Sequence, residues 1–505
     1  MVIRIIGCAA LIALTCHGPA SAQELPDSAT IRERSAAASG PTPNNFREIV
    51  TFQTGDVAGK VLTLRRGSDF RSLSDNGHIH TEAGSYKGER WHQNDNGHTV
   101  IDLSDPGLAN RESTTTSVKR VSQPFDAFEI STLTARGFGT RDYIDPTTYF
   151  VIRRDTLRST GNAITLYDDF RAFGNRHLAT HWHVEDASTG LKSDYHLAEY
   201  TTDVIQDTDV AIPPIRRALL EFPANTTHVR LPARLAPDGH WIVRVTIGDR
   251  GLDFLLDTGA SGITMDTASA AQLGISPTNV FQNAVNAGRI TSGKLIVPEM
   301  HVGELTLHDV VAQAVPDTIH VEDAKIVGLL GFDFLAEAQF TLDYERGNVT
   351  VDRFGSYSEP QLPRTAALDI RLSTQQPMIS TTIDGAVAER IVLDTGATAS
   401  LLIFDYFARR NPDVFPNNKQ VRSTKRFSGI GGRFETTAYK LNDIVVGGID
   451  FKDFTVYRVA SNSYSSPSDG LMGSDFLRLF TLTLDYPNGK LYLSANALGR
   501  SAMGR

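Results

Sequence analysis

An internal repeat constrains the fold of this chain more than any other feature of its sequence. Three pairs of segments match between residues 229–354 and residues 365–495, with offsets of 137, 142 and 142 residues. The matched pairs are Leu255–Ala260 with Val392–Ala397, Gly328–Leu335 with Gly470–Leu477, and Leu342–Tyr344 with Leu484–Tyr486. Because there are only two copies and each exceeds 100 residues, the repeat predicts two duplicated lobes and not a solenoid.

Each copy of the repeat predicts the same short run of secondary structure. A strand of alternating apolar and polar residues is followed by a turn and then by a returning apolar strand. Asp-Thr-Gly comes directly after that second strand. The strand, turn and returning strand are residues 243–247, 248–251 and 254–256 in the first copy, and residues 379–383, 384–385 and 391–393 in the second. A short helix and a closing β-hairpin are expected after Gly331 and after Gly473. Each Asp-Thr-Gly therefore falls where a buried strand ends in a tight loop.

The two tripeptides supply one carboxylate from each lobe, Asp257 and Asp394, as candidate catalytic residues. Two like charges at contact distance cannot both ionise, so one carboxyl keeps its proton to a higher pH than a free carboxyl. The protonated group can donate to a substrate carbonyl while the ionised group takes a proton from an attacking water. The acid and base roles stay unassigned, because the two pKa values belong to the pair.

The residues beside each aspartate suit the same task. Gly259 and Gly396 allow a sharp turn and bring backbone N–H groups close to a carboxylate without a Cβ clash. The hydroxyls of Thr258 and Thr395 can bond the backbone of the opposite loop and pin the two loops together. The apolar residues before each aspartate anchor the loop in the core, which gives the rigidity that such a site needs.

Taken together, residues 229–495 resemble the retropepsin/pepsin clan of aspartic peptidases. In that clan each lobe carries an Asp-Thr-Gly and, downstream, two hydrophobic residues and a glycine, which Leu329–Gly331 and Leu471–Gly473 match here. Ala260 and Ala397 resemble the retroviral type more than the pepsin type. Retroviral enzymes dimerise to complete their site, but this chain holds both halves, so a monomer is expected. The resemblance implies a mostly β, bilobal module that hydrolyses peptide or protein substrates without a cofactor.

A glycine-rich stretch in the second copy, Ser428–Phe434, resembles the flap tip of retropepsins. Its candidate substrate-binding residues are Gly429, Ile430, Gly431 and Gly432. A flexible hairpin without that role is an equal alternative. The matching interval of the first copy, residues 286–289, has no such tip, and neither copy shows a flap tyrosine of the pepsin kind. The strength of catalysis and the substrate are therefore open.

Residues 45–215 predict a separate β-rich domain before the repeat. The segments Val61–Leu64, Tyr149–Ile152 and Ala163–Leu166 are short strands bounded by Gly, Asp and Asn clusters. In pattern the domain resembles the half-barrel of bacterial lipoprotein carriers, a curved antiparallel sheet with an apolar concavity. Residues 23–44, rich in Ser, Ala, Pro and Gly, predict a flexible linker. A second linker, with two prolines, is expected at residues 355–364.

The first 22 residues have the pattern of a secretory signal peptide. Arg4 provides a positive start, residues 5–14 an apolar stretch too short to cross a bilayer, and residues 20–22 (Ala-Ser-Ala) a cleavage site. We therefore expect export to a bacterial periplasm or beyond, with no integral membrane segment after cleavage. Both cysteines, Cys8 and Cys16, lie inside this segment, so the processed chain has no disulfide, thiolate metal ligand or cysteine nucleophile.

Charge and histidine patterns argue against two further classes of function. With 49 basic and 58 acidic residues, a net charge of −9 and no long run of one sign, the chain lacks the basic face of a nucleic-acid binder. His78 and His80, and likewise His181 and His183 near His177, would place two imidazoles on one strand face, which is half of a zinc site. No compelling further ligand accompanies them, so we expect hydrogen-bonded or solvated histidines and no metal.

Two other readings of the chain stay open at this point. In the first, the protein is a catalytically weak or silent periplasmic binding protein that holds a peptide or apolar ligand with the protease fold and the amino-terminal domain. Two intact carboxylates argue against it, because a binder gains nothing from holding two acids together at an energetic cost. In the second, the amino-terminal domain is an inhibitory or targeting segment for the protease.

Overall fold

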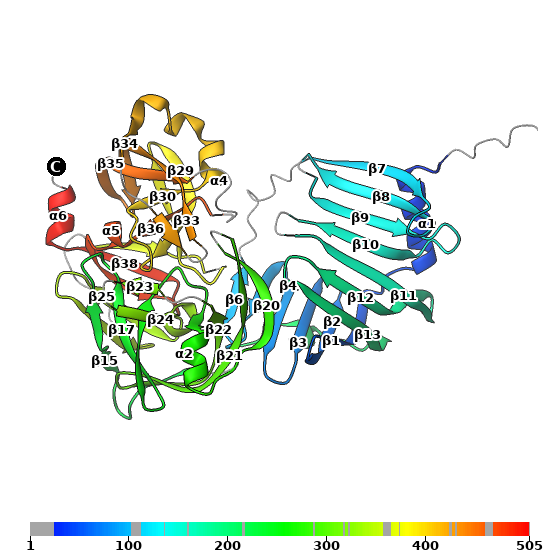
Figure 1. The fold of residues 1–505 in the computed structure, drawn as a ribbon, viewed down its shortest axis with the longest axis horizontal. Coiled ribbons are helices and arrows are strands. Elements are labelled where there is room, and N and C mark those ends of the chain that lie inside the picture. The colour runs from blue at the N-terminus through cyan, green and yellow to red at the C-terminus, as the bar shows by residue number, and fades with distance from the viewer. Residues whose placement is uncertain are drawn as a thin grey trace, which may run out of the picture.

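The structure is a computed structural model in which most of the chain is described. The described residues are 25–102, 113–135, 137–158, 161–214, 218–285, 288–316, 319–321, 324–356, 365–372, 374–423, 427–429, 432–459 and 468–503. They form a broad amino-terminal sheet followed by a module of two lobes (Figure 1). The fold is mostly β, which confirms the prediction for both parts of the chain.

The amino-terminal domain is one curved antiparallel sheet of 13 strands (Figure 1). The chain runs outward from the central strand β1 to the edge strand β6, continues from the opposite edge at β7, and returns to β13 beside β1. Tight turns join neighbouring strands such as β2 and β3 or β11 and β12, where Gly67 and Gly174 have a positive φ of 64° and 62°. The strands are β1 Asn45–Thr54, β2 Val57–Arg66, β3 Asp69–Asp75, β4 His80–Tyr86, β5 Glu89–Gln93, β6 Thr99–Asp102, β7 Thr114–Val121, β8 Ala127–Thr134, β9 Gly139–Ile144, β10 Val151–Leu157, β11 Ala163–Phe173, β12 Arg176–Asp186 and β13 Leu191–Thr202.

The expectation of a flexible linker over residues 23–44 is wrong for its central part, which forms helix α1 (Ser28–Ser39). Asp27 caps the helix by accepting a hydrogen bond from the N–H of Thr30 at 2.7 Å, and Gly40 ends it with a φ of 75°. Ile31 is fully buried against side chains of β8 and β9. One apolar anchor and two caps thus stabilise a helix that the small and polar composition did not reveal.

The bilobal module repeats one plan of strands in each lobe. In lobe 1 the strand before Asp-Thr-Gly, β18, pairs in parallel with β24, and in lobe 2 β29 pairs in parallel with β36. The elements of lobe 1 and its approach are β14 Leu220–Glu221, β15 His228–Arg230, β16 Ala233–Leu235, β17 Trp241–Ile247, β18 Arg250–Leu256, β19 Ile263–Asp266, α2 Thr267–Gln272, β20 Thr278–Val285, β21 Gly288–Val302, β22 Leu305–Val315, β23 Ile319–Val321, β24 Ala324–Leu330, α3 Phe332–Leu335, β25 Ala338–Asp343 and β26 Asn348–Arg353.

The elements of lobe 2 are β27 Thr365–Asp369, β28 Met378–Ile383, β29 Ala386–Asp394, β30 Leu401–Ile403, α4 Asp405–Arg410, β31 Gln420–Val421, β32 Phe427–Gly429, β33 Gly432–Phe434, β34 Thr436–Val446, β35 Ile449–Val459, β36 Gly470–Gly473, α5 Ser474–Leu477, β37 Phe480–Asp485, β38 Lys490–Ala495 and α6 Ala497–Met503. The described residues also include three short 3-10 turns: η1 Asp207–Val210, η2 Pro412–Val414 and η3 Asn417–Lys419. The short helices expected after Gly331 and Gly473 are α3 and α5, and the closing hairpins are β25–β26 and β37–β38.

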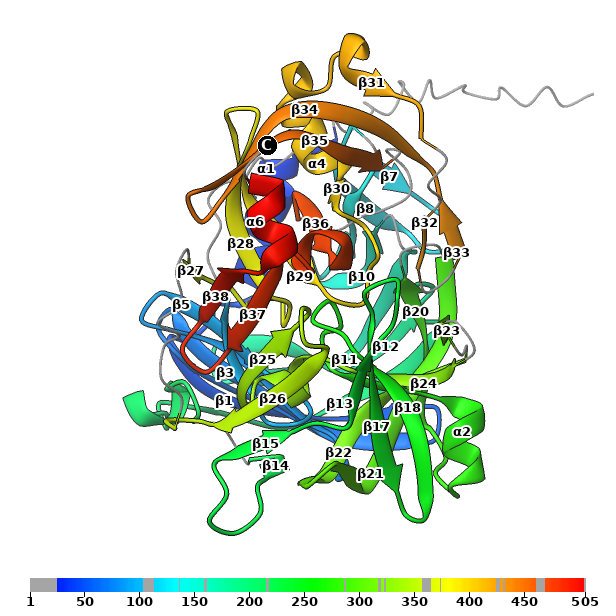
Figure 2. The ribbon, with the colours of Figure 1, turned by 90° about the vertical axis from the view of Figure 1, so that its left-hand side faces the viewer.

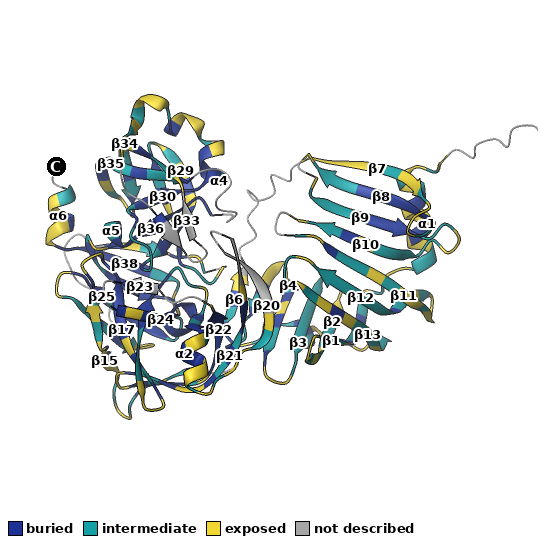
Figure 3. Cartoon of the chain, in the orientation of Figure 1, coloured by how far each residue is buried: buried dark blue, intermediate teal, exposed yellow. Residues whose placement is uncertain are grey.

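A six-stranded sheet joins the two lobes, in the order β15-β26-β25-β37-β38-β27. Its central pair, β25 and β37, places Phe340 opposite Leu484, so the equivalent strands of the two copies meet. One continuous cluster of buried apolar side chains includes residues of both lobes, and Figure 3 shows this buried interior in dark blue. Because the lobes share a sheet and a core, their facing loops are held at a defined separation.

The loop between β5 and β6 anchors the amino-terminal domain to lobe 1. The carboxylate of Asp333 in α3 accepts hydrogen bonds from the Asn94 and Asn96 side-chain amides, at 2.6 Å each, and from His98 Nδ1 at 3.2 Å. His98 Nε2 lies 2.7 Å from Glu337. Burial alone would lower the pKa of His98, but its bonds to the two carboxylates outweigh that effect and raise the pKa to about 9. This loop therefore inserts a buried cation between two buried acids.

The same loop also contacts the long strands of lobe 1. The side-chain amide of Asn96 bonds both backbone groups of Val311 in β22, at 2.9 and 3.0 Å, as a neighbouring strand would. Asp95 forms an ion pair with Lys294 of β21 at 2.5 Å. The amino-terminal domain is thus joined to lobe 1 through α3, β21 and β22.

Candidate active site

Parallel strand pairing places each candidate aspartate at the end of a buried strand. In lobe 1, Leu256 lies opposite Leu330, and the N–H of Asp257 donates to the carbonyl of Leu330 at 3.0 Å. In lobe 2, Asp394 lies opposite Gly473. The two hydrophobic residues of each repeat therefore lie in the strand beside the aspartate, and the glycine ends that strand in lobe 2 and directly follows it in lobe 1.

Each carboxylate lies against the glycine of the opposite loop. A Cβ added to Gly259 would lie 2.4 Å from the carboxyl carbon of Asp394, and one added to Gly396 would lie 2.5 Å from that of Asp257. Non-bonded atoms do not approach this closely, so a larger residue at either position would force the loops apart. Each carboxylate also accepts a hydrogen bond from the N–H of its own glycine, at 2.8 Å for Asp257 and 2.9 Å for Asp394.

The two threonines cross-link the loops, as the sequence leads us to expect. The hydroxyl of Thr258 donates to the carbonyl of Leu393 at 2.7 Å and accepts from the N–H of Thr395 at 3.0 Å. The hydroxyl of Thr395 does the same in the other direction, donating to Leu256 at 2.6 Å and accepting from Thr258 at 3.1 Å. Both threonines are 1% exposed. Four buried hydrogen bonds thus fix the separation of the two aspartates.

Burial and mutual repulsion act on the protonation of the pair. Burial raises the pKa of Asp257, while hydrogen bonds from Asp394 and Gly259 and the charge of His240 partly oppose the rise. The pKa of Asp394 is raised well above its usual range, first by burial and then by the negative charge of Asp257 and the hydrogen bond between the two carboxyl groups. The pair therefore shares one proton over a range of pH in which an isolated carboxyl would be ionised.

Two cross-lobe contacts to this site were missed from the sequence. His240 Nε2 lies 3.0 Å from the carbonyl oxygen of Gly396, and the side-chain amide of Gln376 donates to the carbonyl of Gly259. His240 directly precedes β17 and Gln376 lies two residues before β28, and the offset between them, 376 − 240 = 136, is one less than that between the aspartates. A residue-by-residue comparison of the repeats could have paired them, but their types differ and carry no motif.

Both lobes carry a hairpin in the interval where a flap is expected. In lobe 2, β32 and β33 form it, with Gly429 ending one strand and Gly432 beginning the next, while Ile430 and Gly431 lie outside the described residues. In lobe 1, β20 and β21 form a longer hairpin although the sequence there has no glycine-rich tip. Figures 1 and 2 place both hairpins on one side of the module. Of the four candidate flap residues, the described part shows Gly429 and Gly432 paired with each other in the lobe 2 hairpin and not with the aspartates.

Three of the histidines considered as part of a zinc site lie within hydrogen-bond distance of an acidic side chain. His181 Nδ1 lies 2.7 Å from Asp168, and His183 Nδ1 lies 2.9 Å from Asp194. His80 Nε2 lies 3.0 Å from Glu82. Within the described ranges, no group of three or more His, Cys, Asp or Glu residues has an arrangement that could hold a metal ion. Among the described helices, none is long and apolar enough to span a membrane.

Comparison with known proteins relates both lobes to one family. Residues 243–334 and 379–476 each match the family described as aspartyl protease. No curated protein compared with the chain matches it. Among solved structures, an aspartic proteinase from Irpex lacteus is 15% identical and covers 55% of this chain and 99% of its own, with a TM-score of 0.36. A LolA superfamily protein from Nitrosomonas europaea is 13% identical and covers 37% of this chain and 98% of its own, with a TM-score of 0.29.

Proposed function

We propose that this protein is an exported aspartic endopeptidase in which Asp257 and Asp394 activate a water molecule. The observation that carries the proposal is the hydrogen bond between the carboxyl groups of Asp257 and Asp394, which come from two equivalent loops that Thr258 and Thr395 cross-link. The match of both lobes to the aspartyl protease family supports the same assignment. Holding two acids together is unfavourable, so the arrangement is best explained by chemistry that needs a shared proton.

Peptide hydrolysis follows from the states that this pair can adopt. With one proton on the pair, the protonated carboxyl donates to the substrate carbonyl oxygen while the ionised carboxyl accepts a proton from the water that attacks the carbonyl carbon. The tetrahedral intermediate then collapses as a proton passes to the leaving amine. The carboxylates and the water supply all the groups required, so we propose no cofactor. An extended substrate would lie beneath the two flap hairpins and pair with their strands.

Export and a monomeric state complete the proposal. The signal-peptide pattern of residues 1–22, which lie outside the described residues, supports export to a periplasm or beyond. Both half-sites come from one chain, so the site needs no second copy. The described loop 94–98 bonds Asp333, Glu337, Val311 and Lys294 of lobe 1. We therefore propose that the amino-terminal domain supports lobe 1 at this loop.

Digestion of a peptide library tests the proposed function. The full processed chain should cleave internal peptide bonds from acidic to neutral pH, with kcat/KM rising and then falling as the pair passes through its singly protonated state. Mass spectrometry of the products reports both cleavage and side-chain preference. Binding of library peptides without cleavage at any pH in that range would instead support the binding-protein alternative.

A further inference from the structure

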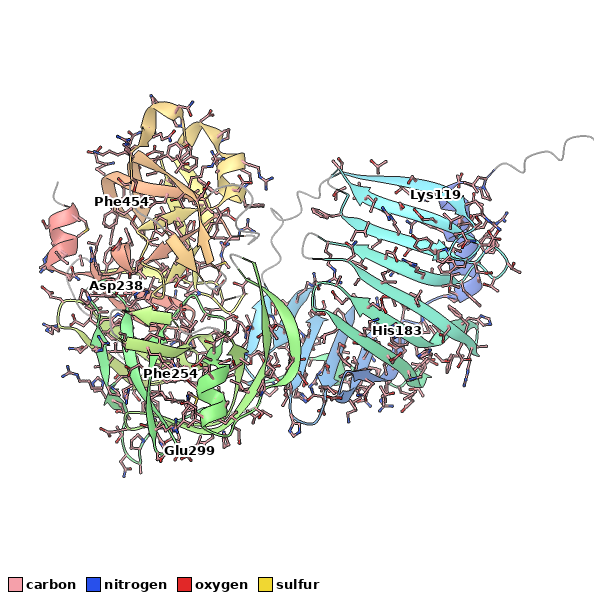
Figure 4. All side chains as sticks on the ribbon, in the orientation of Figure 1. Lys119, His183, Asp238, Phe254, Glu299 and Phe454 are labelled. Atoms are coloured by element: carbon pink, nitrogen blue, oxygen red, sulfur yellow. The ribbon has the colours of Figure 1, made fainter. Side chains whose placement is uncertain are left out.

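The long strand β21 of lobe 1 has two parts with different neighbours. Residues 293–302 pair with β22 in the body of the lobe, whereas residues 288–292 pair with β20. Figure 4 labels Glu299, which lies on the part that pairs with β22. The hairpin of β20 and β21 therefore leaves the body of lobe 1 at Gly293 and Lys294, which we call the hairpin root (Figure 1).

Three strands approach one another closely at the hairpin root. A Cβ added to Gly293 would lie 2.9 Å from the carbonyl oxygen of Thr278 in β20. The hydroxyl of Ser292 donates to the carbonyl of Ala314 in β22 at 2.7 Å and accepts from the side-chain amide of Gln313 at 3.1 Å. Because the packing here is tight, the side chains at the root set the direction in which the hairpin leaves the lobe.

The amino-terminal domain contacts the hairpin root with a charge. Asp95, in the loop between β5 and β6, forms an ion pair with Lys294 at 2.5 Å. The side chains of Asp95 and Lys294 are only 12% and 27% exposed, so solvent ions screen the pair less than an exposed one. The next residue of the loop, Asn96, bonds the backbone of Val311 in β22. The loop therefore holds β22 with one side chain and the root of the hairpin with the other.

The same loop also holds the support of the Asp257 loop, and the repeat shows that this arrangement belongs to lobe 1. Asp333, which the loop 94–98 bonds, lies against the backbone after Asp-Thr-Gly: a Cβ added to Gly262 would lie 2.9 Å from its carboxylate oxygen. The equivalent residue of lobe 2, Asp475, has a side chain 26% exposed and forms an ion pair with Arg478 of its own lobe at 3.6 Å. The two lobes thus hold equivalent aspartates with different parts of the chain.

Resting on the proposed function, we propose that Asp95 is a positioning residue for substrate binding, through which the amino-terminal domain sets the position of the lobe 1 hairpin. Its charge holds Lys294 at the hairpin root, so β20 and the paired part of β21 keep one position relative to the Asp257 loop. A substrate that pairs with these strands then meets a preformed partner, and less conformational entropy is lost on binding.

Steady-state kinetics of the full processed chain tests this role. Asp95→Asn keeps the size of the side chain and removes its charge. KM for a peptide long enough to reach the hairpin should rise about three- to tenfold, while kcat changes by less than about twofold, because the cost of ordering the hairpin falls equally on the bound substrate and the transition state. Lys294→Gln should have the same effect. The double variant should be no worse than either single variant, since the two residues act as a pair.

Asp369→Asn is the matched control. Asp369 pairs with Lys490, also at 2.5 Å, but in the sheet that joins the two lobes. Its loss should leave KM as in the wild type. An unchanged KM in Asp95→Asn, an equal rise in Asp95→Asn and Asp369→Asn, or additive effects of Asp95→Asn and Lys294→Gln overturns the proposal.

Hydrogen exchange followed by mass spectrometry needs no activity, so it separates failure of this inference from failure of the proposed function. In Asp95→Asn the backbone amides of β20 and of residues 288–292 should exchange faster than in the wild type, while those of β25 in the joining sheet should not change. Unchanged exchange in the hairpin, or faster exchange in both regions alike, contradicts the proposal. If the wild type cleaves no peptide, the proposed function fails and this comparison still decides whether Asp95 holds the hairpin. If the wild type cleaves peptides and Asp95→Asn changes neither KM nor exchange, only the inference about Asp95 fails.

Discussion

Replacing either Asp257 or Asp394 with asparagine is expected to lower kcat/KM for peptide hydrolysis by a factor on the order of 10⁴, because proton transfer in both directions is lost. An amide neither accepts the proton of the attacking water nor shares a proton with its neighbour. Since the two groups act as a unit, the double variant should be little worse than either single variant. Steady-state kinetics on a peptide selected from the library measures both effects.

The same substitutions should stabilise the fold at neutral pH. The pKa of Asp394 is raised in the folded protein by burial first and then by Asp257. A carboxyl whose pKa is higher in the folded than in the unfolded state stabilises the folded state at a pH below its unfolded pKa. That contribution to stability is lost as the pH rises through the pKa of the folded state. Asp394→Asn removes this loss, so its melting temperature should exceed that of the wild type at neutral pH and approach it at acidic pH. An inactive variant that melts lower at neutral pH would point to misfolding as the cause.

His98→Ala is expected to lower the free energy of unfolding of lobe 1 by roughly 3–5 kcal/mol, because it leaves two buried carboxylates without their cation. Asp333 and Glu337 have side chains only 5% and 8% exposed, and that of His98 is 4% exposed. The amino-terminal domain should also separate from lobe 1, which limited proteolysis of residues 213–223 would report. Chemical denaturation followed by hydrogen exchange in β21 and β22 measures the loss in the lobe itself.

A matched variant and the pH dependence distinguish this effect from the loss of any histidine. His228 pairs with Asp352 at 2.8 Å, but its side chain is 59% exposed, so His228→Ala should cost less than about 1 kcal/mol. The pKa of His98 is raised to about 9. The contribution of His98 to the free energy of unfolding should be complete below about pH 6.5, which is the pKa of histidine in an unfolded chain. It should decline as the pH rises through about 9. Equal losses of unfolding free energy in the two variants would contradict the buried ion pair. A loss in His98→Ala that grows as the pH rises above about 9 would also contradict it.

The core of the candidate site could be predicted from the sequence because a duplication marks it twice. Asp257 and Asp394, with their threonines and glycines, follow strands of the same type, and the structure brings all six residues together. A single Asp-Thr-Gly would be an ordinary turn between strands. The repeat predicts the pairing because equivalent loops of two lobes related in this way face each other.

Contacts between distant segments could not be predicted in the same way. Asn94 and Asp333 are 239 residues apart, and neither lies in a motif that names the other as a partner. His240 stands alone before a strand, and its role depends on a carbonyl of the opposite lobe. Helix α1 was missed because one buried isoleucine among polar and small residues produces no apolar stripe.

A single turnover in ¹⁸O-enriched water tests directly whether a water activated by Asp257 and Asp394 attacks the peptide. The wild-type chain, in excess over a peptide identified from the library, should place one labelled oxygen in the new carboxyl group of the product in its first turnover, and Asp394→Asn should form no product on that timescale. Unlabelled product from the first turnover would mean that an oxygen of the protein attacks the carbonyl, and labelled product formed at the wild-type rate by Asp394→Asn would remove the dyad from the mechanism.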